Sequence, residues 1–498
     1  MQIKNLTTEI NWNIQKYPHK TAMVYNGKVY SYQDLGRAVS RIASFLISRG
    51  CLLNDVVAVY SYPTPEALIT MIGILQAGGT VLPIDPVLPM GRIRDYVEDS
   101  QPKWLIFFND EVEYEYFDSH LLLSYFSIHH HGCQKIALNR ACIHAQIAYI
   151  LYTSGSTGKP KGVKVSLQGF SYFMDAITDR LTPSSSTSIL SITSLSFDIS
   201  LLELFLPLVN GGQVVFTPPK TAANPEELIS FLDSTSVNMV QATPSIWELI
   251  RTWGWQGNPK LTLLSGGEPL TESLARYLLK SSNSLWNLYG PTETIIWSSA
   301  KQLHPGFSQI TVGVPLRGYH YSIRDKRGLE LPKGKKGELY ISGEGLAEGY
   351  HNDLKSTNAG FVGIDGVRYY KTGDYATQLS DGDYIVSGRI DRQVKIRGYR
   401  IELGEVESIF SKIQGVRQCV VQSIKNPSGS GQHLVVFWIA ENELVENSGE
   451  NGREQINKFR EQLSRSLPSY MIPNKFFCVE SFPLLTNGKI DYNKFSIP

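Results

Sequence analysis

Apolar and polar positions alternate along most of the chain in a pattern that predicts buried strands separated by helices. Residues 67–76 have the length and apolar character of a helix, and Gly78 and Gly79 supply a stop signal. Strands that alternate with helices predict parallel sheets covered by helices, which is an α/β fold. The expected strands are short apolar runs at residues 56–62, 81–84, 147–151, 188–192, 213–216, 238–241 and 261–265.

The pattern changes near residue 340, where strands become shorter and glycines more frequent. After Asp391, runs at 419–423 and 434–439 predict strands, and residues 452–466 predict a helix. We therefore expect a large N-terminal core of parallel or mixed sheets over residues 1–390. A small α+β unit is expected over residues 391–498.

Composition narrows the class of protein. A chain of 498 residues is too long for one hydrophobic core. Its 47 basic and 46 acidic residues give a net charge of +1, so the chain has no excess of positive charge to attract nucleic acid or an anionic membrane. Five cysteines without CxxC spacing favour reduced thiols over a disulfide framework or zinc site. No signal-peptide core or membrane-length apolar run is present, so we expect a soluble, cytoplasmic protein with neither nucleic acid nor membrane as partner.

A loop rich in glycine and hydroxyl side chains follows the strand predicted at 147–151. Such loops turn backbone N–H groups around an anion, and at the carboxyl end of a strand they lie where α/β sheets bind ligands. The loop is not a Walker A sequence, because Pro160 follows the first lysine. A flexible Ser/Gly linker has a similar composition, so the loop alone leaves that alternative open. Its residues are Thr153, Ser154, Gly155, Ser156, Thr157, Gly158, Lys159 and Lys161.

Four further motifs carry candidate chemistry. Glu293 lies in NLYGPTET beside hydroxyls, and Mg²⁺ takes one or two carboxylates and completes its shell with phosphate oxygens and water. Asp374 in YKTGD can accept hydrogen bonds from two ribose hydroxyls. A basic run spans residues 389–400, and Lys489 lies on a predicted tight turn. Each motif alone also fits a structural role. Glu293 could be a carboxylate at a helix start and Asp374 a turn residue, while the basic run could be a solvated face and Lys489 a surface lysine.

In this order and spacing the motifs resemble those of the adenylate-forming enzymes, most closely the amino-acid adenylation domains of non-ribosomal peptide synthetases. The resemblance covers nearly the whole chain and includes LQAGGTVLPIDP at 75–86, SLSFDIS at 194–200, GELYISGEGLAEGY at 337–350 and LPSYMIP at 467–473. It implies the adenylate-forming fold, with a small C-terminal lid that turns about a hinge at Asp391 and presents one face for adenylation and another for thioester formation.

The resemblance implies ATP and Mg²⁺ as cofactors and attack of a substrate carboxylate on the α-phosphorus, catalysed by positioning and electrostatics. Glu293 would bind Mg²⁺, and Lys489 would bridge the carboxylate and α-phosphate oxygens. One departure is Leu167, where many relatives have a histidine, which puts an imidazole role there in doubt. The implied catalytic residues are Thr153, Glu293, Arg400 and Lys489. The implied nucleotide contacts are the loop residues given above with Gly266, Gly267, Glu268, Tyr289, Gly290, Thr292, Asp374 and Arg389.

The resemblance also implies an amino-acid substrate, because Asp198 would give its buried ammonium a fixed counter-charge. Trp297 and Leu288 would fill the volume of a substrate side chain, so the wall resembles that of glycine-activating domains. Alanine comes next, since one methyl group is worth only about 1–3 kcal/mol. The implied substrate contacts are Asp198, Ile199, Leu202, Gln241, Leu264, Gly266, Leu288, Ile296, Trp297 and Lys489.

The implied macromolecular partner is a carrier protein with a phosphopantetheine arm. The chain ends a few residues after Lys489 without a carrier domain, which leaves open a free-standing enzyme or one unit of a larger synthetase. It also leaves open the need for a small activating partner protein. The alternatives are an acyl- or aryl-CoA ligase of the same superfamily, against which Asp198 weighs, and an inactive nucleotide-binding scaffold. The scaffold would be expected to have lost Lys489, Glu293 or Asp374.

Overall fold

The computed structural model of the protein describes residues 4–108, 122–129, 145–155, 158–219, 221–234, 237–425, 432–441, 450–485 and 489–495. By its internal contacts the chain forms two compact units. The first comprises Met1–Pro86, Val97–Tyr152 and Lys161–Asp391, and the second comprises Val87–Tyr96, Thr153–Pro160 and Arg392–Pro498. Two segments from the N-terminal half therefore belong to the second unit, which a single boundary along the sequence does not anticipate.

A mixed sheet of the first unit has, within the described residues, the strand order β14-β13-β12-β11-β9-β10-β1-β2. Its neighbours are parallel except for the edge pairs β1–β2 and β13–β14, which are antiparallel. The parallel strands end on one edge, where α/β sheets bind ligands. The bounds are β1 Thr21–Tyr25, β2 Lys28–Ser31, β9 Ser188–Ser191, β10 Gln213–Phe216, β11 Met239–Ala242, β12 Asn258–Gly266, β13 Ser282–Tyr289 and β14 Ser299–Leu303.

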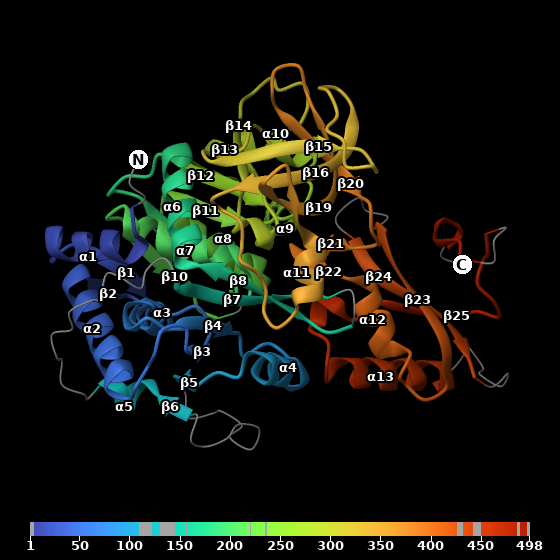
Figure 1. The fold of residues 1–498 in the computed structure, drawn as a ribbon, viewed down its shortest axis with the longest axis horizontal. Helices are drawn as coiled ribbons and strands as arrows, with labels where there is room; N and C mark the ends of the chain where they lie inside the picture. Colours follow the sequence, from blue (N-terminus) through green and yellow to red (C-terminus); the bar gives the residue numbers. More distant parts are fainter. Residues whose placement is uncertain are drawn as a thin grey trace. The chain divides into compact units, whose positions relative to one another are not determined.

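A second sheet of this unit has the order β17-β8-β7-β4-β3-β5-β6 in the part of the chain that is described. Its β3–β4, β3–β5, β4–β7 and β5–β6 pairs are parallel, and α3 (Pro65–Ala77) lies beside β3 and β4 (Figure 1). The bounds are β3 Val56–Tyr60, β4 Thr80–Ile84, β5 Trp104–Phe107, β6 Leu122–Ser124, β7 Ile147–Thr153, β8 Lys161–Ser166 and β17 Gly349–Tyr350.

Helices form where the sequence supplies both a buried face and an end signal. Helix α3 begins after Thr64, whose hydroxyl accepts from the N–H of Ala67, and ends at Gly78, whose φ of 88° only glycine adopts readily. The other helices that include residues of the first unit are α1 Leu6–Lys16, α2 Tyr32–Ser48, α4 Met90–Ser100, α5 Tyr125–His129, α6 Leu167–Leu181, α7 Ile199–Val209, α8 Pro225–Ser234, α9 Pro244–Thr252, α10 Glu272–Lys280 and α11 Leu354–Gly360.

An antiparallel sheet completes the described part of the first unit. Its strands follow the order β15-β16-β19-β18, with β20 paired to β19. The register of the β19–β20 hairpin places Asp374 opposite Arg389. The bounds are β15 Tyr319–Arg324, β16 Lys336–Gly343, β18 Phe361–Ile364, β19 Val367–Gln378 and β20 Tyr384–Arg389.

The second unit contains a small sheet and two helices that cover it. Antiparallel β23 and β24 are joined by β25 parallel to β24 (Figure 1). Alternate residues of β23 and β24 face two separate cores, and Phe410 of α12 and Phe459 of α13 pack in the larger one. The bounds are β21 Val394–Ile396, β22 Tyr399–Ile401, α12 Leu403–Phe410, β23 Val416–Lys425, β24 Gln432–Ala440, α13 Glu450–Ser464 and β25 Lys475–Cys478.

The predicted fold class is confirmed: sheets of mixed direction, covered by helices, are followed by a smaller α+β part. The predicted run 213–216 is β10, and the run 238–241 is β11 displaced by one residue. The polar stretch after Glu441 lies largely outside the described residues, and α13 already begins at Glu450.

Candidate active site

A buried carboxylate stands at the start of α7. Asp198 directly precedes this helix with helical torsion angles, and it is 5% exposed. Residues 199–208 of α7 are all buried, and the carboxylate lies at the N-terminal end of this helix, where the helix dipole favours negative charge. Burial, with the nearby charge of Asp198, raises the pKa of the Tyr149 phenol. A carboxylate in these surroundings is suited to pair with a cation that has lost its water.

The side chains predicted to form the pocket wall gather near the carboxyl ends of β11, β12 and β13. The parallel register pairs Gln241 with Leu264 and Gly266 with Leu288. The structure thus brings together residues that lie far apart in the sequence. One buried cluster contains the apolar members of the predicted wall, which are Ile199, Leu202, Leu264, Leu288, Ile296 and Trp297.

The indole of Trp297 lies directly against Gly266. A Cβ atom on Gly266 would stand 2.5 Å from Cη2 and 2.9 Å from Cζ3 of the ring, so a larger residue would displace the indole. At the opposite end of the ring, Nε1 donates a hydrogen bond of 3.0 Å to Oε1 of Gln241. The ring is therefore held at both ends, by an amide of β11 and by the backbone of β12.

The two residues before Trp297 have left-handed backbone torsions. Ile295 has a φ of 56° and Ile296 a φ of 66°, values that β-branched residues rarely adopt. Such residues cost of order 1–3 kcal/mol and persist only where the surroundings enforce them. Both side chains are buried, at 0% and 1% exposure. The strained backbone thus immediately precedes Trp297, the residue predicted to fill the substrate pocket.

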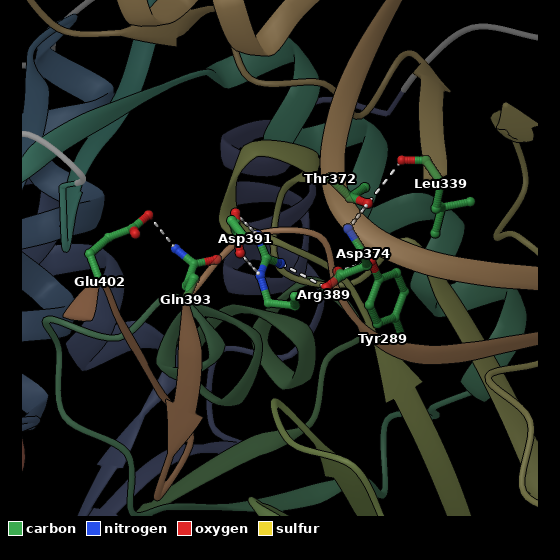
Figure 2. Close-up of polar contacts among 8 residues, drawn as sticks. All are labelled: Tyr289, Leu339, Thr372, Asp374, Arg389, Asp391, Gln393 and Glu402. Atoms are coloured by element: carbon green, nitrogen blue, oxygen red, sulfur yellow. Dashed lines mark hydrogen bonds and ion pairs between the residues drawn. The ribbon is translucent and has the colours of Figure 1, made fainter. Parts of the chain in front are cut away.

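A second set of predicted residues forms a chain of hydrogen bonds in the first unit (Figure 2). Figure 2 shows the Asp374 carboxylate between the Tyr289 hydroxyl, which donates at 2.6 Å, and the Arg389 guanidinium, which donates at 2.7 Å. Arg389 also binds both carboxylate oxygens of Asp391, at 2.7 and 2.8 Å. The Asp374 N–H donates to Thr372, which fixes the carboxylate's strand. Burial and the Asp374 charge raise the pKa of Tyr289, so its hydroxyl stays a donor.

Glu293 lies in a 3₁₀ turn over Thr292–Thr294 and is 1% exposed. The hydroxyl of Tyr350 donates to its Oε1 at 2.7 Å, and the ammonium of Lys161 stands 5.5 Å from the centre of the Tyr350 ring. A fixed carboxylate is a hard oxygen donor of the kind that Mg²⁺ prefers, so the donor chemistry fits the predicted ion. Tyr350 is the last residue of the motif GELYISGEGLAEGY, and the sequence does not predict its hydrogen bond to Glu293.

The residues predicted to line the adenine lie at the ends of β12 and β13. Gly267 has a φ of 87°, which favours glycine, and the carboxylate of Glu268 accepts from the N–H of Ser245 at 3.0 Å. A Cβ on Gly290 would stand 2.5 Å from the carbonyl oxygen of Ile296. The backbone around Gly266–Gly267 and Gly290 thus approaches its neighbours too closely for side chains.

The part of the predicted phosphate loop from Thr153 to Pro160 belongs to the second unit, whereas Lys161 belongs to the first. Ser154 donates to the carbonyl of Arg400 at 2.7 Å and accepts from the N–H of Glu402 at 3.2 Å. The N–H of Gly155 donates to the carboxylate of Glu405 at 3.1 Å. Phosphate binding by this loop remains a prediction. Ser156 and Thr157 lie outside the described residues.

Lys489 and Arg400 also lie in the second unit. The carbonyl of Lys489 accepts from the N–H of Leu485 at 2.7 Å, next to a bridge between Leu484 and Ile490. In the same unit Gln393 donates to Glu402 at 2.7 Å, as Figure 2 shows. The roles expected for these residues remain predictions.

Two negative findings apply to the described residues. Within them, no group of three or more histidine, cysteine, aspartate or glutamate side chains is arranged to hold a metal ion. No helix in this part of the chain has both the length and the apolar character needed to cross a bilayer.

Comparison with known proteins decides the family. A model described as AMP-binding enzyme matches residues 10–351, and one described as AMP-binding enzyme C-terminal domain matches residues 405–489. The chain belongs to the AMP-binding enzymes. The resemblance to adenylation domains of non-ribosomal peptide synthetases is confirmed by the relatives of this AMP-binding enzyme.

The relatives include single proteins and parts of much longer ones. The chain is 33% identical over 500 residues to zwittermicin A synthase ZmaJ of Bacillus cereus, covering 96% of this chain and 92% of the relative. It is 33% identical over 493 residues to a dimodular nonribosomal peptide synthase of Bacillus subtilis (strain 168). That match covers 97% of this chain and only 20% of the relative, so the chain spans about a fifth of that protein's length.

A solved structure agrees with the family. The crystal structure of a four-domain nonribosomal peptide synthetase bound to AMP and glycine matches this AMP-binding enzyme with a TM-score of 0.71 and 33% identity. The match covers 99% of this chain and 36% of that one.

The structure also reveals a buried residue that the sequence analysis did not select. Glu203 lies on α7 with 0% exposure and is bonded to Gln241. Its signal in the sequence is a single charged residue inside the apolar run ISLLELFLPLV, a pattern that requires a buried partner.

Proposed function

We propose that the protein activates a small amino acid, glycine in preference to alanine, with ATP. The products would be an aminoacyl-adenylate and pyrophosphate, and the aminoacyl group would then pass to the phosphopantetheine thiol of a carrier protein in non-ribosomal peptide synthesis. ATP and Mg²⁺ are the cofactors of this proposal. It extends the family's AMP-binding activity to one class of substrate and one acceptor.

The contact between Trp297 and Gly266 carries the choice of substrate. The ring occupies the space beside β12, and the apolar members of the predicted wall, Leu288 included, are buried in one cluster. Asp198 supplies a buried negative charge for an ammonium group, whereas an aryl or fatty acid offers no cation to pair with it. The related synthetase structure was solved with AMP and glycine bound, which supports the same choice.

In the first step, a carboxylate oxygen of the amino acid attacks the α-phosphorus of ATP. The bond from the α-phosphorus to the oxygen that bridges it to the β-phosphorus breaks, and pyrophosphate leaves with that electron pair. A carboxylate needs no general base, so the protein's contribution is to align the reactants and to offset charge. Asp198 would hold the ammonium, and Lys489 would draw the carboxylate and α-phosphate oxygens together.

Each part of the nucleotide would have its own set of contacts. Asp374 and Arg389 would bind the ribose, Tyr289 would contact adenine, and the loop from Thr153 to Lys161 would bind the phosphates. Glu293 would hold Mg²⁺, and that ion supplies charge neutralisation on the phosphate oxygens when bound. The pre-formed Asp374–Arg389 pair supports this assignment because it presents a fixed carboxylate.

In the second step, the carrier thiolate would attack the carbonyl carbon of the adenylate. The bond between that carbon and the phosphate oxygen breaks, AMP leaves, and a thioester forms. The lid predicted after the hinge at Asp391 would present a different face in this step.

The decisive experiment is amino-acid-dependent exchange of labelled pyrophosphate into ATP. The assay would be run with all twenty amino acids, with aryl and fatty acids, and with Mg²⁺ present or removed by chelation. We expect glycine to give the highest rate, alanine the next, and chelation to abolish exchange. A preference for a bulky amino acid would contradict the glycine assignment. Activity only with aryl or fatty acids would favour a CoA ligase, and a flat response would favour a scaffold.

A further inference from the structure

Glu203 is enclosed by hydrogen-bond donors. Its Oε2 accepts from the backbone N–H groups of Ile192 and Thr193, at 3.0 and 3.1 Å. Its Oε1 accepts from the Thr193 hydroxyl at 2.5 Å and from Nε2 of Gln241 at 3.1 Å. The side chain has 0% exposure, so water does not replace any of these partners. Both oxygens of the carboxylate therefore accept hydrogen bonds from buried donors.

This arrangement fixes the amide of Gln241. Its Nε2 donates to Oε1 of Glu203 and, at 2.8 Å, to the carbonyl oxygen of Ile199. Both partners only accept, so the NH₂ end of the amide must face α7, and which end is oxygen follows from this network. The Oε1 atom of Gln241 consequently faces the opposite way, towards the indole of Trp297.

Trp297 completes the relay because its indole N–H can only donate. The bond to Oε1 of Gln241 measures 3.0 Å, and the ring is 1% exposed. If the amide turned over, NH₂ would face N–H, and the buried indole would lose its acceptor. The left-handed backbone of Ile295 and Ile296 stores strain next to the ring, so this hydrogen bond opposes a relaxation that would move it.

We propose that Glu203 is a positioning residue for substrate selection: it locks the Gln241 amide in the one orientation that holds the Trp297 ring across Gly266. The inference rests on the proposed function, in which that ring excludes substrate side chains. Glu203 does not touch the substrate in this account. It acts through Gln241, and its removal should loosen discrimination between amino acids before it affects ATP binding.

The test uses Glu203→Gln in the full-length protein. The substituted side chain carries an NH₂ group that would be surrounded by other donors. Its oxygen should keep the hydrogen bonds from the backbone N–H groups of Ile192 and Thr193, so its NH₂ group would face Gln241. Gln241 would then turn over to accept, which sets its NH₂ against the indole N–H. We expect kcat/KM for alanine relative to glycine to rise about tenfold, equivalent to about 1.4 kcal/mol, with ATP affinity within about twofold of wild type.

Matched variants separate positioning from general damage. Thr193→Val removes another donor to the same oxygen of Glu203 but leaves Gln241 in place, and it should leave the alanine-to-glycine ratio unchanged. Gln241→Met removes the indole's acceptor, together with one donor to Glu203 while the carboxylate itself stays in place, and should raise the ratio like Glu203→Gln. In a Trp297→Phe background, which has no N–H to orient, Glu203→Gln should add no further change. Gln241→Met keeps the test decisive if Glu203→Gln does not fold.

A spectroscopic measurement makes the test independent of the substrate. The indole N–H resonance of Trp297 can be assigned by its absence in Trp297→Phe, and it should shift in Glu203→Gln and Gln241→Met but not in Thr193→Val. An unshifted resonance with an unchanged ratio would overturn the proposal, as would equal losses for both amino acids with the resonance in place. If wild type prefers a bulky amino acid, the proposed function fails, whereas the resonance still decides whether Glu203 orients the ring.

Discussion

Two buried carboxylates lie five positions apart, Glu203 on α7 and Asp198 directly before this helix. Glu203 accepts four hydrogen bonds from the protein, whereas Asp198 makes no capping hydrogen bond to its own helix. The first carboxylate is thus committed to the fold around the pocket. The second is the carboxylate that we propose to pair with the substrate ammonium. On that proposal, two carboxylates five positions apart would serve two purposes.

For Asp198, we expect Asp198→Asn to reduce glycine-dependent pyrophosphate exchange by about 10²–10³-fold. The amide keeps the volume but leaves the substrate's ammonium buried without a counter-charge, a loss of about 3–5 kcal/mol for broken buried pairs. Calorimetric titration should find ATP affinity close to that of wild type. A comparable loss of ATP affinity would instead indicate a folding defect.

For Glu203, we expect a stability change with pH. Burial raises the pKa of this carboxyl from 4.5 to about 7, against the opposing effect of its hydrogen-bond donors. A raised folded pKa contributes stability below about pH 4.5 that is lost as pH rises through about 7. The unfolding free energy of wild type minus that of Glu203→Gln should fall by about 3 kcal/mol over this window. Urea denaturation at several pH values checks this, and a flat difference would contradict it.

At the scale of elements, the hairpin β19–β20 joins the predicted ribose residues to the predicted hinge. Its register sets Asp374 opposite Arg389, and the guanidinium reaches both that carboxylate and Asp391. The pair with Asp374 is nearly buried, with side-chain exposures of 14% and 7%, whereas Asp391 is 46% exposed. Two ion pairs of one arginine should therefore differ strongly in value.

We expect Arg389→Met to lower the free energy of unfolding by about 3 kcal/mol, because the buried Asp374 carboxylate loses its cation and keeps the hydrogen bond from Tyr289. Asp391→Asn is the matched control and should cost less than about 1 kcal/mol, since the exposed pair is screened by water. Urea denaturation of both variants measures the contrast. Equal losses would show that the hairpin, rather than the buried charge, is what Arg389 supports.

Burial along the chain could be predicted from the sequence better than hydrogen-bond partners could. The run at 213–216 is continuous in apolar residues and appears as β10, whereas the edge strands β2 and β14, KVYS and SAKQL, lack such a run and were not predicted. The resemblance to known motifs predicts Trp297 and Gln241 as wall residues, but no sequence pattern predicts the hydrogen bond between Glu203 and Gln241. That bond joins helix α7 to strand β11 through two residues that are 38 positions apart in the chain.

At the scale of the whole molecule, the second unit is assembled from three separate stretches of the chain. Arg92, from the segment Val87–Tyr96, forms an ion pair with Glu405 of α12 at 2.5 Å, with side-chain exposures of 4% and 0%. The same carboxyl group accepts from Gly155 of the segment Thr153–Pro160. One buried glutamate therefore ties all three stretches together. Burial raises the pKa of Glu405, and the charge of Arg92 opposes that rise.

We expect Arg92→Met to destabilise the second unit by about 3–5 kcal/mol, because Glu405 is left buried without its cation. Hydrogen exchange should show lost protection in β23–β25 while β9–β13 keep theirs. Adding Glu405→Gln should recover part of the loss. The control Arg465→Ala breaks a pair with exposures of 70% and 69% and should have almost no effect. Uniform loss across both units would contradict this local role.

The three-part origin of the second unit constrains how such enzymes can be recombined. A chimera that joins a foreign core to residues 392–498 at the apparent boundary would import Glu405 but not the arginine that neutralises it. The graft would carry a buried, unmatched charge even if every residue of the transplanted segment were native. Domain exchange should succeed better when residues 87–96 and 153–160 are transferred together with the C-terminal part. The segment to be exchanged is therefore defined by charge pairing rather than by one crossover point.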